Sequence, residues 1–258
     1  DRFYACDFEP IPDLNDIGFE LSETKVPPDR TSKDLIENYS QTRDIPSKEG
    51  TSRMGPHLRF GTVSIREVVQ RAAKYEPTFL KELIWREFFM QILFHFPRVV
   101  NNNFRSRYNG ISWNSSEDEF ERWCEGRTGY PLVDAGMRQL NATGYMHNRV
   151  RMIVASFLTK NLGIHWREGA RWFWDTLVDA DLASNTLGWQ WTAGCGADAA
   201  PYFRIFNPVT QAQKFDPDGS YIRQWVPEIA TLPNKHLAHP WAAPAGVLEE
   251  HKLKLGRD

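Results

Sequence analysis

The residues least suited to either an ordinary core or an ordinary surface are concentrated in the stretch that runs from Asp179 to Pro208. Two carboxylates, Asp179 and Asp181, precede an Ala-Ser-Asn sequence that we expect to form a turn and that ends in the amide of Asn185. Trp189 and Trp191 follow two residues apart, and on a helix such residues point roughly 160° away from each other. One indole can therefore face a pocket while the other faces away, although two large aromatics could equally anchor a helical core.

A second set of polar and aromatic side chains lies within residues 78–95, where Trp85 and Arg86 follow Glu82 by three and four residues. On a helix this spacing places all three on one face. A carboxylate and an indole on one face could hold a base, because the carboxylate accepts amide N–H groups while the indole stacks on the ring. An i,i+4 ion pair between Glu82 and Arg86 at the surface is the alternative interpretation.

Residues 50–55, Gly-Thr-Ser-Arg-Met-Gly, have the composition of a phosphate-binding segment. Thr51 and Ser52 supply hydroxyls, Arg53 supplies a guanidinium, and the start of a helix would supply free backbone N–H groups. Such donors suit a diphosphate, although a simple helix cap explains the same residues. No Gly-x-Gly-x-x-Gly follows a predicted strand, so a Rossmann-type cofactor site is not expected.

A basic segment at residues 146–152 offers two faces of a helix. Asn148 and Met152 share one face, and His147 and Arg151 share another. The first face could contact a ligand, whereas a basic helix with no partner is usually a solvated surface.

Two arginines of this segment have candidate partners elsewhere. Arg151 would suit an ion pair with Asp179, and Arg149 would suit a phosphate group. His147 is not predicted to bind a metal, because no other His or Cys stands at ligand spacing from it.

Tryptophans are unusually frequent, with ten in the chain beside sixteen phenylalanines, which is more than packing alone needs. Trp113, Trp166 and Trp189 lie in separate segments, so they do not belong to one local packing stripe. The three could be unrelated core residues, or they could form a set of stacked rings.

The hydrophobic pattern predicts an all-α fold, because apolar residues recur at helical spacing and we find no strand alternation and no repeat. Residues 78–95 give the longest helix, which Pro97 ends, and Ser64 with Glu67 predicts a capping box. Further helices are expected at residues 117–125, 130–143, 147–162, 169–177 and 187–193. Residues 1–30 are proline-rich and are expected to form an extended linker, with one helical domain over residues 31–258.

The amino-acid composition limits the classes of protein to which the chain can belong. With 41% hydrophobic and 25% charged residues the chain is typical of a soluble globular domain, and no apolar run reaches the roughly 18 residues of a membrane span. The first residues do not resemble a secretory signal, and three scattered cysteines favour a reducing cytoplasm over a disulfide framework. A net charge of −2 argues against indiscriminate nucleic-acid binding, although 31 Lys and Arg permit a local basic face.

Several of these strings together resemble the FAD-binding domain of the photolyase/cryptochrome family. They are Asp-Ala-Asp-Leu-Ala-Ser-Asn at residues 179–185, Gly-Trp-Gln-Trp at 188–191 and Tyr-Phe-Arg-Ile-Phe-Asn-Pro at 202–208. The likeness runs from Tyr39 to Pro240. It implies a multi-helix FAD-binding domain, with the family's N-terminal α/β antenna domain absent from this chain. It also implies FAD, an antenna pigment of folate or deazaflavin type on the missing domain, damaged DNA as partner, no membrane contact, and a cytoplasmic monomer.

The resemblance assigns roles to the residues singled out above. It implies that FAD contacts Tyr39, Thr51, Ser52, Arg53, Met54, Gly55, Arg86, Asn148, Arg151, Asp179, Asp181 and Asn185. The catalytic pocket for a flipped pyrimidine dimer would be formed by Glu82, Trp85, Asn148, Met152 and Trp191, with phosphates held by Arg43 and Arg149. Trp189, Trp166 and Trp113 would carry electrons between the flavin and the surface. Family members usually have Ser at position 55, so a side-chain contact of that kind is missing in this chain.

The expected activity is that of a deoxyribodipyrimidine photo-lyase, a carbon–carbon lyase in which reduced FAD transfers an electron under light to split cyclobutane dimers. Asn185 favours this over plant or animal cryptochromes, which usually carry Asp or Cys there, and the string at 146–149 differs from the paired His of (6-4) photolyases. A cryptochrome-type blue-light photoreceptor is the alternative, since residues 216–219 and 223–225 also resemble plant cryptochromes. A flavin-free helical DNA-binding module, as in large-primase relatives, is a third interpretation.

Overall fold

The structure is a computed structural model that describes residues 10–20, 28, 30–199 and 204–253. The regular elements of the described residues are all helices, with one isolated bridge between Asn114 and Ile164 as the only β pairing in this part of the chain. The all-α prediction is therefore confirmed. In chain order the α-helices are α1 (Lys33–Glu37), α2 (Tyr39–Thr42), α3 (Gly55–Phe60), α4 (Ile65–Tyr75), α5 (Pro77–His95), α6 (Glu117–Glu125), α7 (Pro131–Thr143), α8 (Asn148–Ser156), α9 (Trp166–Thr176), α10 (Leu182–Ala193), α11 (Pro208–Phe215), α12 (Ser220–Trp225), α13 (Asn234–Leu237) and α14 (Ala245–Glu250). Short 3-10 turns cover Pro97–Val100, Ser106–Gly110, Pro227–Ile229 and Pro240–Ala242.

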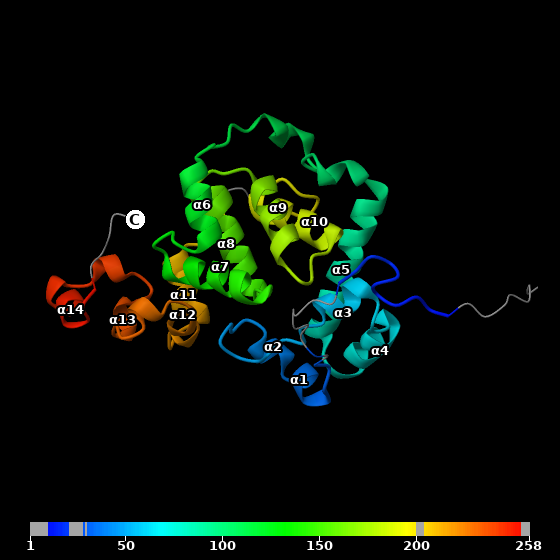
Figure 1. Cartoon of the computed structure of the whole chain (residues 1–258), viewed down its shortest axis with the longest axis horizontal. Coiled ribbons are helices and arrows are strands. Elements are labelled where there is room, and N and C mark those ends of the chain that lie inside the picture. The colour runs from blue at the N-terminus through cyan, green and yellow to red at the C-terminus, as the bar shows by residue number, and fades with distance from the viewer. Residues whose placement is uncertain (1–9, 21–27, 29, 200–203, 254–258) are drawn as a thin grey trace, which may run out of the picture.

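Helix α10 is the centre of the arrangement, since it packs against α5, α8 and α9. Figure 1 shows α6, α7 and α8 on one side of α9 and α10, and α5 on the other. The first four helices gather near α5, while α11 and α12 lie against α7. Residues far apart in the sequence are thereby brought around one helix, which is what a binding site at α10 requires.

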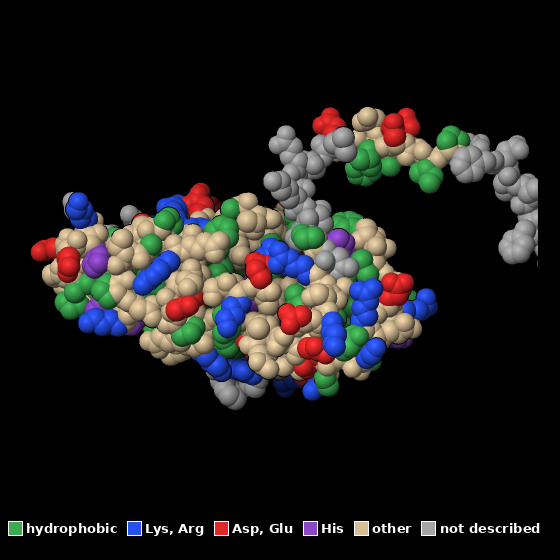
Figure 2. All heavy atoms as spheres, turned by 90° about the horizontal axis from the view of Figure 1, so that it is seen from below, with side chains coloured by type: hydrophobic (Ala, Val, Ile, Leu, Met, Phe, Trp, Pro, Cys, Tyr) green, Lys and Arg blue, Asp and Glu red, His purple; other side chains and the backbone are tan. Residues whose placement is uncertain are grey.

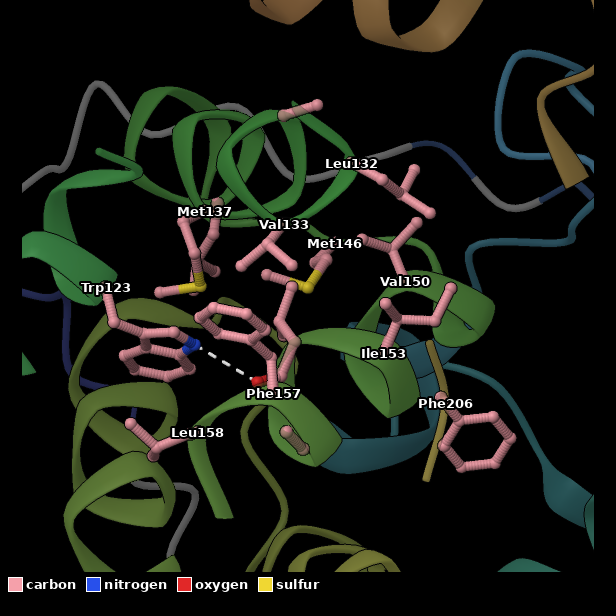
Figure 3. Packing of buried hydrophobic residues seen from close by; sticks show 14 of the residues in the cluster. Trp123, Leu132, Val133, Met137, Met146, Val150, Ile153, Phe157, Leu158 and Phe206 are labelled. Atoms are coloured by element: carbon pink, nitrogen blue, oxygen red, sulfur yellow. Dashed lines mark hydrogen bonds between the residues drawn. The ribbon is translucent and has the colours of Figure 1, made fainter. Parts of the chain in front are cut away.

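The main hydrophobic core lies between α6, α7, α8 and the turn that follows α8. Figure 3 shows Met137 and Leu158 near Trp123 and Ile153 farther along the same cluster, and the Trp123 Nε1 donates to the Val154 carbonyl at 3.1 Å. All four side chains are fully buried. A buried indole N–H with a carbonyl partner adds no unsatisfied donor to the core.

Close packing of α7 on α8 depends on a glycine. A Cβ built at Gly136 would meet the Val150 Cγ1 at 2.4 Å and the Val154 Cγ1 at 3.1 Å, so a larger residue would push the helices apart. Because α8 carries pocket residues, this contact fixes one wall of the site.

The predicted helices agree with the structure except at several ends. Helix α10 begins at Leu182 because Asp181 caps it, with Oδ1 accepting from the Ser184 N–H at 2.9 Å. The expected turn over Ala-Ser-Asn is therefore wrong, and those residues are helical. Ser64 is the N-cap of α4 as predicted, but the described structure has no side-chain capping bond there, so the capping box is not formed.

Two further ends differ from the predictions. The single helix expected at 147–162 runs as α8 to Ser156 and then widens into a π-helical turn at Phe157–Asn161. Helix α9 begins at Trp166, three residues before the expected start, because the His165 ring caps it through Nδ1, which accepts from the Arg167 N–H at 3.1 Å. Pro97 follows the end of α5 at His95 as expected.

Of the predicted linker, only residues 10–20, 28 and 30 are described. Residues 10–20 form an exposed turn in which Asp13 and Asp16 each accept the other's backbone N–H, at 2.9 and 3.0 Å. On the face in Figure 2, basic and acidic side chains are interspersed, in keeping with the small net charge.

Candidate functional site

A cavity of about 260 Å³ lies between α5, α8 and α10 and the loop that leads into α10. Its size is just below the roughly 300 to 1,000 Å³ of typical ligand pockets. Many predicted site residues line it: Glu82, Trp85, Arg86, Asn148, Arg151, Met152, Asp179, Asp181, Asn185 and Trp189. Side chains from four separate segments thus converge on one hollow.

An ion pair between Arg151 and Asp179 forms the floor of the cavity, as the sequence predicts. The Arg151 Nη2 donates to the Asp179 Oδ2 at 2.9 Å, and the Arg151 Nε donates to the Met146 carbonyl at 2.8 Å. The second oxygen of Asp179 is buried and has no partner within the described residues. Since buried acceptors are nearly always satisfied, this oxygen is a candidate acceptor for a ligand N–H or O–H.

Gly55 lies directly against this carboxylate. A Cβ at Gly55 would meet the Asp179 Oδ2 at 2.4 Å and the Asp179 Cβ at 2.7 Å. Gly55 therefore packs against Asp179, although none of residues 50–55 is among the described residues that line the cavity. A serine here would require Asp179 to shift.

The rest of the predicted phosphate segment lies outside the cavity lining of the described residues. The hydroxyls of Thr51 and Tyr145 share a hydrogen bond of 3.2 Å, and the Arg53 guanidinium pairs with Glu49 at 2.7 Å. Arg53 also has a φ of +52°, which is uncommon for any residue with a side chain and often occurs at functional sites. Ser52 has intermediate burial, and Met54 is buried in a smaller core cluster with Ile36.

Tyr39 belongs to this same cluster. Its ring meets Phe79 edge-on at a centroid distance of 5.0 Å. Burial raises the pKa of the phenol to about 12, against the opposing influence of the Arg43 guanidinium. The hydroxyl is therefore a hydrogen-bond donor at every physiological pH.

Asn185 and Gly188 form the α10 wall. The Asn185 Nδ2 donates to the Ala170 carbonyl at 2.8 Å, which leaves the amide oxygen to act as an acceptor. A Cβ at Gly188 would meet no described atom within 4 Å, so this residue opens space inside the cavity. The wall thus combines a polar acceptor with room for a flat ring.

The mouth of the cavity carries Glu82 and Trp85. Glu82 pairs with Arg43 at 2.6 Å instead of Arg86, so the i,i+4 alternative does not form. Arg86 donates to the Leu58 carbonyl at 3.0 Å, and its cation lines the cavity. The indole of Trp85 is 40% exposed, as a ring that receives a ligand at an opening should be.

The two predicted phosphate-binding arginines are held by carboxylates. Arg149 donates to the Asp44 Oδ1 through Nη2 at 2.7 Å and through Nε at 3.2 Å. Arg43 holds Glu82 and lies 3.8 Å from the same oxygen of Asp44. Neither guanidinium is free in the described structure, so a phosphate would have to compete for it.

The three tryptophans of the expected electron path contact other aromatic rings, and their role in electron transfer stays a prediction. Trp189 lines the cavity, and its ring contacts that of Trp123 at a centroid distance of 6.0 Å. The sequence pattern does not single out Trp123. The ring of His165 contacts both Trp113 and Trp166, at 5.0 and 5.6 Å between centroids.

Trp191 points away from Trp189, as residues two apart must. Its ring stacks on Phe206 at a centroid distance of 6.3 Å. The described residues that line the cavity do not include Trp191, and its contact with a dimer beside Trp85 stays a prediction. Residues 202 and 203 belong to the family-like motif at 202–208 and lie outside the described residues.

The chain is similar to known proteins over most of its length. The FAD binding domain of DNA photolyase, as a family, matches residues 79–258. The chain belongs to the photolyase family.

Relatives within the photolyase family agree with this assignment. A deoxyribodipyrimidine photo-lyase of Agrobacterium fabrum is 49% identical over 86% of this chain and 48% of its own length. A bacterial class III photolyase from Agrobacterium tumefaciens has a TM-score of 0.82 and 48% identity, over 86% of this chain and 48% of that one. A cryptochrome from Synechocystis sp. PCC6803 has a TM-score of 0.80 and 39% identity, over 87% and 48% of the two chains. This chain spans about half the length of these relatives.

The predicted family and its helical FAD-binding domain are thus confirmed. Within the described residues no helix is long and apolar enough to cross a membrane, and no cluster of His, Cys, Asp and Glu could hold a metal ion. His147 instead caps α8 with its ring, where Nδ1 accepts from the Arg149 N–H at 3.2 Å.

Asp44, Trp123, His165 and Gly188 are among the photolyase-fold residues at or near the site that sequence reasoning missed, as are the cavity-lining Phe89, Phe173 and Thr192. Asp44 had a signal, because it directly follows Arg43 and could have been considered as its partner. Trp123 and His165 had none, since their contacts join segments distant in the sequence.

Proposed function

We propose that this chain is the FAD-binding part of an enzyme that uses light to split cyclobutane pyrimidine dimers in DNA. The observation that carries the proposal is one cavity with Asp179 and Asn185 inside and Glu82 and Trp85 at its opening. The inner groups suit a flavin, and the outer groups suit a pair of bases. The two sites share a boundary, as electron transfer between their occupants requires.

The inner groups fit an isoalloxazine ring. The unpaired oxygen of Asp179 is an acceptor for an N–H or O–H group of the cofactor, and the open space at Gly188 admits a flat ring. A cavity of about 260 Å³ suits the ring system, with the remainder of FAD extending toward residues 50–55 behind Asp179. When bound in its reduced form, FAD supplies an electron after excitation by light.

Arg86 and Arg151 line the cavity together with the carboxylates of Glu82, Asp179 and Asp181, so a reduced, anionic ring would have to lie nearest the two cations. Arg86 lines the cavity, and its hydrogen bonds go to a carbonyl and a thioether, so no carboxylate among those partners neutralises it. Arg151 adds a second cation, which Asp179 partly offsets. Asn185 offers an amide oxygen that accepts an N–H and carries no proton to donate, which suits a reduced ring over an oxidised one.

The outer groups would bind the dimer. Trp85 offers an exposed face for stacking, and Glu82 offers a carboxylate that Arg43 fixes at 2.6 Å. Asn148 and Met152, one turn apart on α8, complete this side with an amide and a thioether. The damaged bases would have to leave the duplex, and base flipping is a known property of photolyases as a class.

The test is light-dependent repair of a defined substrate. The chain is loaded with FAD, reduced chemically, and illuminated with an oligonucleotide that contains one cyclobutane thymine dimer. We expect recovery of thymine absorbance in the light, none in the dark, and none with FAD alone. Unchanged dimer content under light, with flavin bound and DNA bound, would contradict the proposal.

A cryptochrome-type photoreceptor is the second candidate, supported by the likeness to the Synechocystis cryptochrome. The same assay separates the two, because a photoreceptor would reduce its flavin in the light without repairing the dimer. An antenna pigment on a further domain, a monomeric state and a cytoplasmic location stay predictions.

A further inference from the structure

Asp44 lies between the two arginines that are expected to bind DNA phosphates. Both Nη2 and Nε of Arg149 donate to its Oδ1, at 2.7 and 3.2 Å, and the Nε of Arg43 lies 3.8 Å from the same oxygen. The side chains of Arg43 and Arg149 are only 18% and 20% exposed, whereas that of Asp44 is 39% exposed. The carboxylate therefore covers the cations on the side that faces solvent.

The remaining surfaces of the two guanidinium groups are also in contact with protein. Arg149 lies over the ring of Phe215 at 4.6 Å and approaches the Met152 Sδ at 3.8 Å. Arg43 lies over the ring of Tyr39 at 5.2 Å and bonds to Glu82 at 2.6 Å. These contacts hold both cations in place, so the position that Asp44 occupies is the one that an incoming anion would need.

The four charged groups cancel. Arg43 and Arg149 contribute two positive charges, and Asp44 and Glu82 contribute two negative ones. A phosphate presents to a guanidinium the same kind of acceptor oxygens as a carboxylate. It can reach Arg149 only by displacing Asp44, and it meets the repulsion of that carboxylate as it approaches.

We propose that Asp44 is a specificity-determining residue, a carboxylate that occupies the phosphate position on Arg149 and so weakens binding to undamaged DNA. This inference rests on the proposed function. Undamaged DNA gains only phosphate contacts at this surface, and displacing Asp44 reduces that gain. DNA with a dimer also fills the cavity at Trp85 and Glu82, and these extra contacts offset the displacement. Discrimination is the difference between the two affinities.

The test compares Asp44→Asn with the parent chain, both loaded with FAD. Fluorescence anisotropy gives the affinity for a lesion-free duplex and for the same duplex with one thymine dimer, over a series of salt concentrations. We expect Asp44→Asn to bind the lesion-free duplex up to about fivefold more tightly, the range of one exposed ion pair. The slope of log affinity against log salt should steepen by about 0.9, the value of one added phosphate contact. The ratio of dimer to lesion-free affinity should fall.

Two further variants make the result specific. Asp118→Asn makes the same change of charge on α6, where Asp118 forms an exposed i,i+4 pair with Arg122, and it should leave the salt slope unchanged. Asp44→Glu keeps the charge and should keep the discrimination of the parent. Circular dichroism of each variant verifies the fold.

An unchanged or weaker affinity of Asp44→Asn for lesion-free DNA would overturn the inference, because Asp44 would then merely position Arg149. Equal gains from Asp118→Asn and Asp44→Asn would overturn it as well, because the effect would be one of net charge. Failure of the proposed function looks different: neither the parent nor any variant would prefer the dimer-containing duplex.

Discussion

Arg151 binds one oxygen of Asp179 at 2.9 Å and leaves the other oxygen buried without a partner in the described part of the chain. The pair joins α8 to the loop before α10, so it fixes two walls of the cavity at once. Among the buried side-chain atoms without a partner in the described residues, this oxygen is the one that belongs to a residue lining this cavity, so it is available to a ligand N–H or O–H.

Asp179→Asn should weaken FAD binding by about ten- to a hundredfold, since it removes a charged acceptor worth roughly 1.5 to 3 kcal/mol. Quenching of flavin fluorescence during titration measures the affinity. Asp175→Asn is the matched control, because Asp175 is exposed on α9 and does not line the cavity. If the two variants bind FAD equally well, Asp179 is not a cofactor ligand.

Gly169→Ala should distort the setting of Trp189. The added Cβ would lie 2.1 Å from the indole, which is far inside contact distance. We expect a loss of about 1 to 3 kcal/mol of unfolding free energy from overpacking, reduced by the roughly 1 kcal/mol that alanine gains over glycine in a helix. Urea unfolding measures this.

The control for that substitution is Gly188→Ala on α10, whose Cβ would meet no described atom within 4 Å. It should raise the unfolding free energy by about 1 kcal/mol. Similar stability changes in the two variants would contradict the packing of Trp189 on Gly169.

Trp85→Ala should weaken binding of dimer-containing DNA while FAD affinity stays nearly the same. Stacking of a base on an aromatic ring contributes about 1 to 3 kcal/mol, or about fivefold to more than a hundredfold in affinity. Trp174→Ala is the control, because Trp174 is 42% exposed, close to the 40% of Trp85, yet does not line the cavity. Undiminished affinity of Trp85→Ala for the dimer would remove this residue from the substrate site.

The stability of the chain should depend on the protonation of His147. Burial lowers the pKa of this ring to about 4 from 6.5, with Arg151 and Arg149 lowering it further and Asp44 opposing them. The unfolded chain therefore binds the extra proton at pH values where the folded chain does not. Stability should fall as the pH decreases from about 6.5 to about 4, by roughly 3 kcal/mol in total, and this contribution should level off below that.

His147→Asn tests this directly, because Asn can still cap α8 but does not titrate. Unfolding free energies from urea titrations between pH 4 and pH 7 should show a shallower slope for the variant, by up to about 1.4 kcal/mol per pH unit. If the unfolding free energies of the parent and the variant change with pH in parallel, His147 has the same protonation in the folded and the unfolded chain, which would contradict this prediction.

The periodicity of apolar residues and the positions of capping residues predict most of the helices, but they predict the helix ends less accurately. The 78–95 pattern and Pro97 gave α5 almost to the residue, because periodicity and a proline act within one segment. The sequence pattern places the start of α10 too late, because an aspartate such as Asp181 suits a ligand site as well as a helix cap. Its side chain caps the helix and also lines the cavity.

Contacts between segments limited the prediction of the site. The Arg151–Asp179 pair could be inferred, since both charges stood out in polar motifs. The pairing of Arg43 with Glu82 and of Arg149 with Asp44 could not, because the spacing along the chain says nothing about residues 39 and 105 positions apart. The same reason explains why the contact of Trp123 with Trp189 was missed.

The most direct test of a flavin site in this cavity is whether the chain retains FAD. The parent chain and Gly188→Leu are each incubated with FAD, desalted, and examined by absorption spectroscopy, with circular dichroism to verify the fold. Leucine would fill the open space at position 188 without meeting a described neighbour at its Cβ. We predict about one bound flavin per parent chain, and none bound to Gly188→Leu with an unchanged fold. Equal amounts of flavin in both, or none in the parent, would contradict a flavin site between α5, α8 and α10.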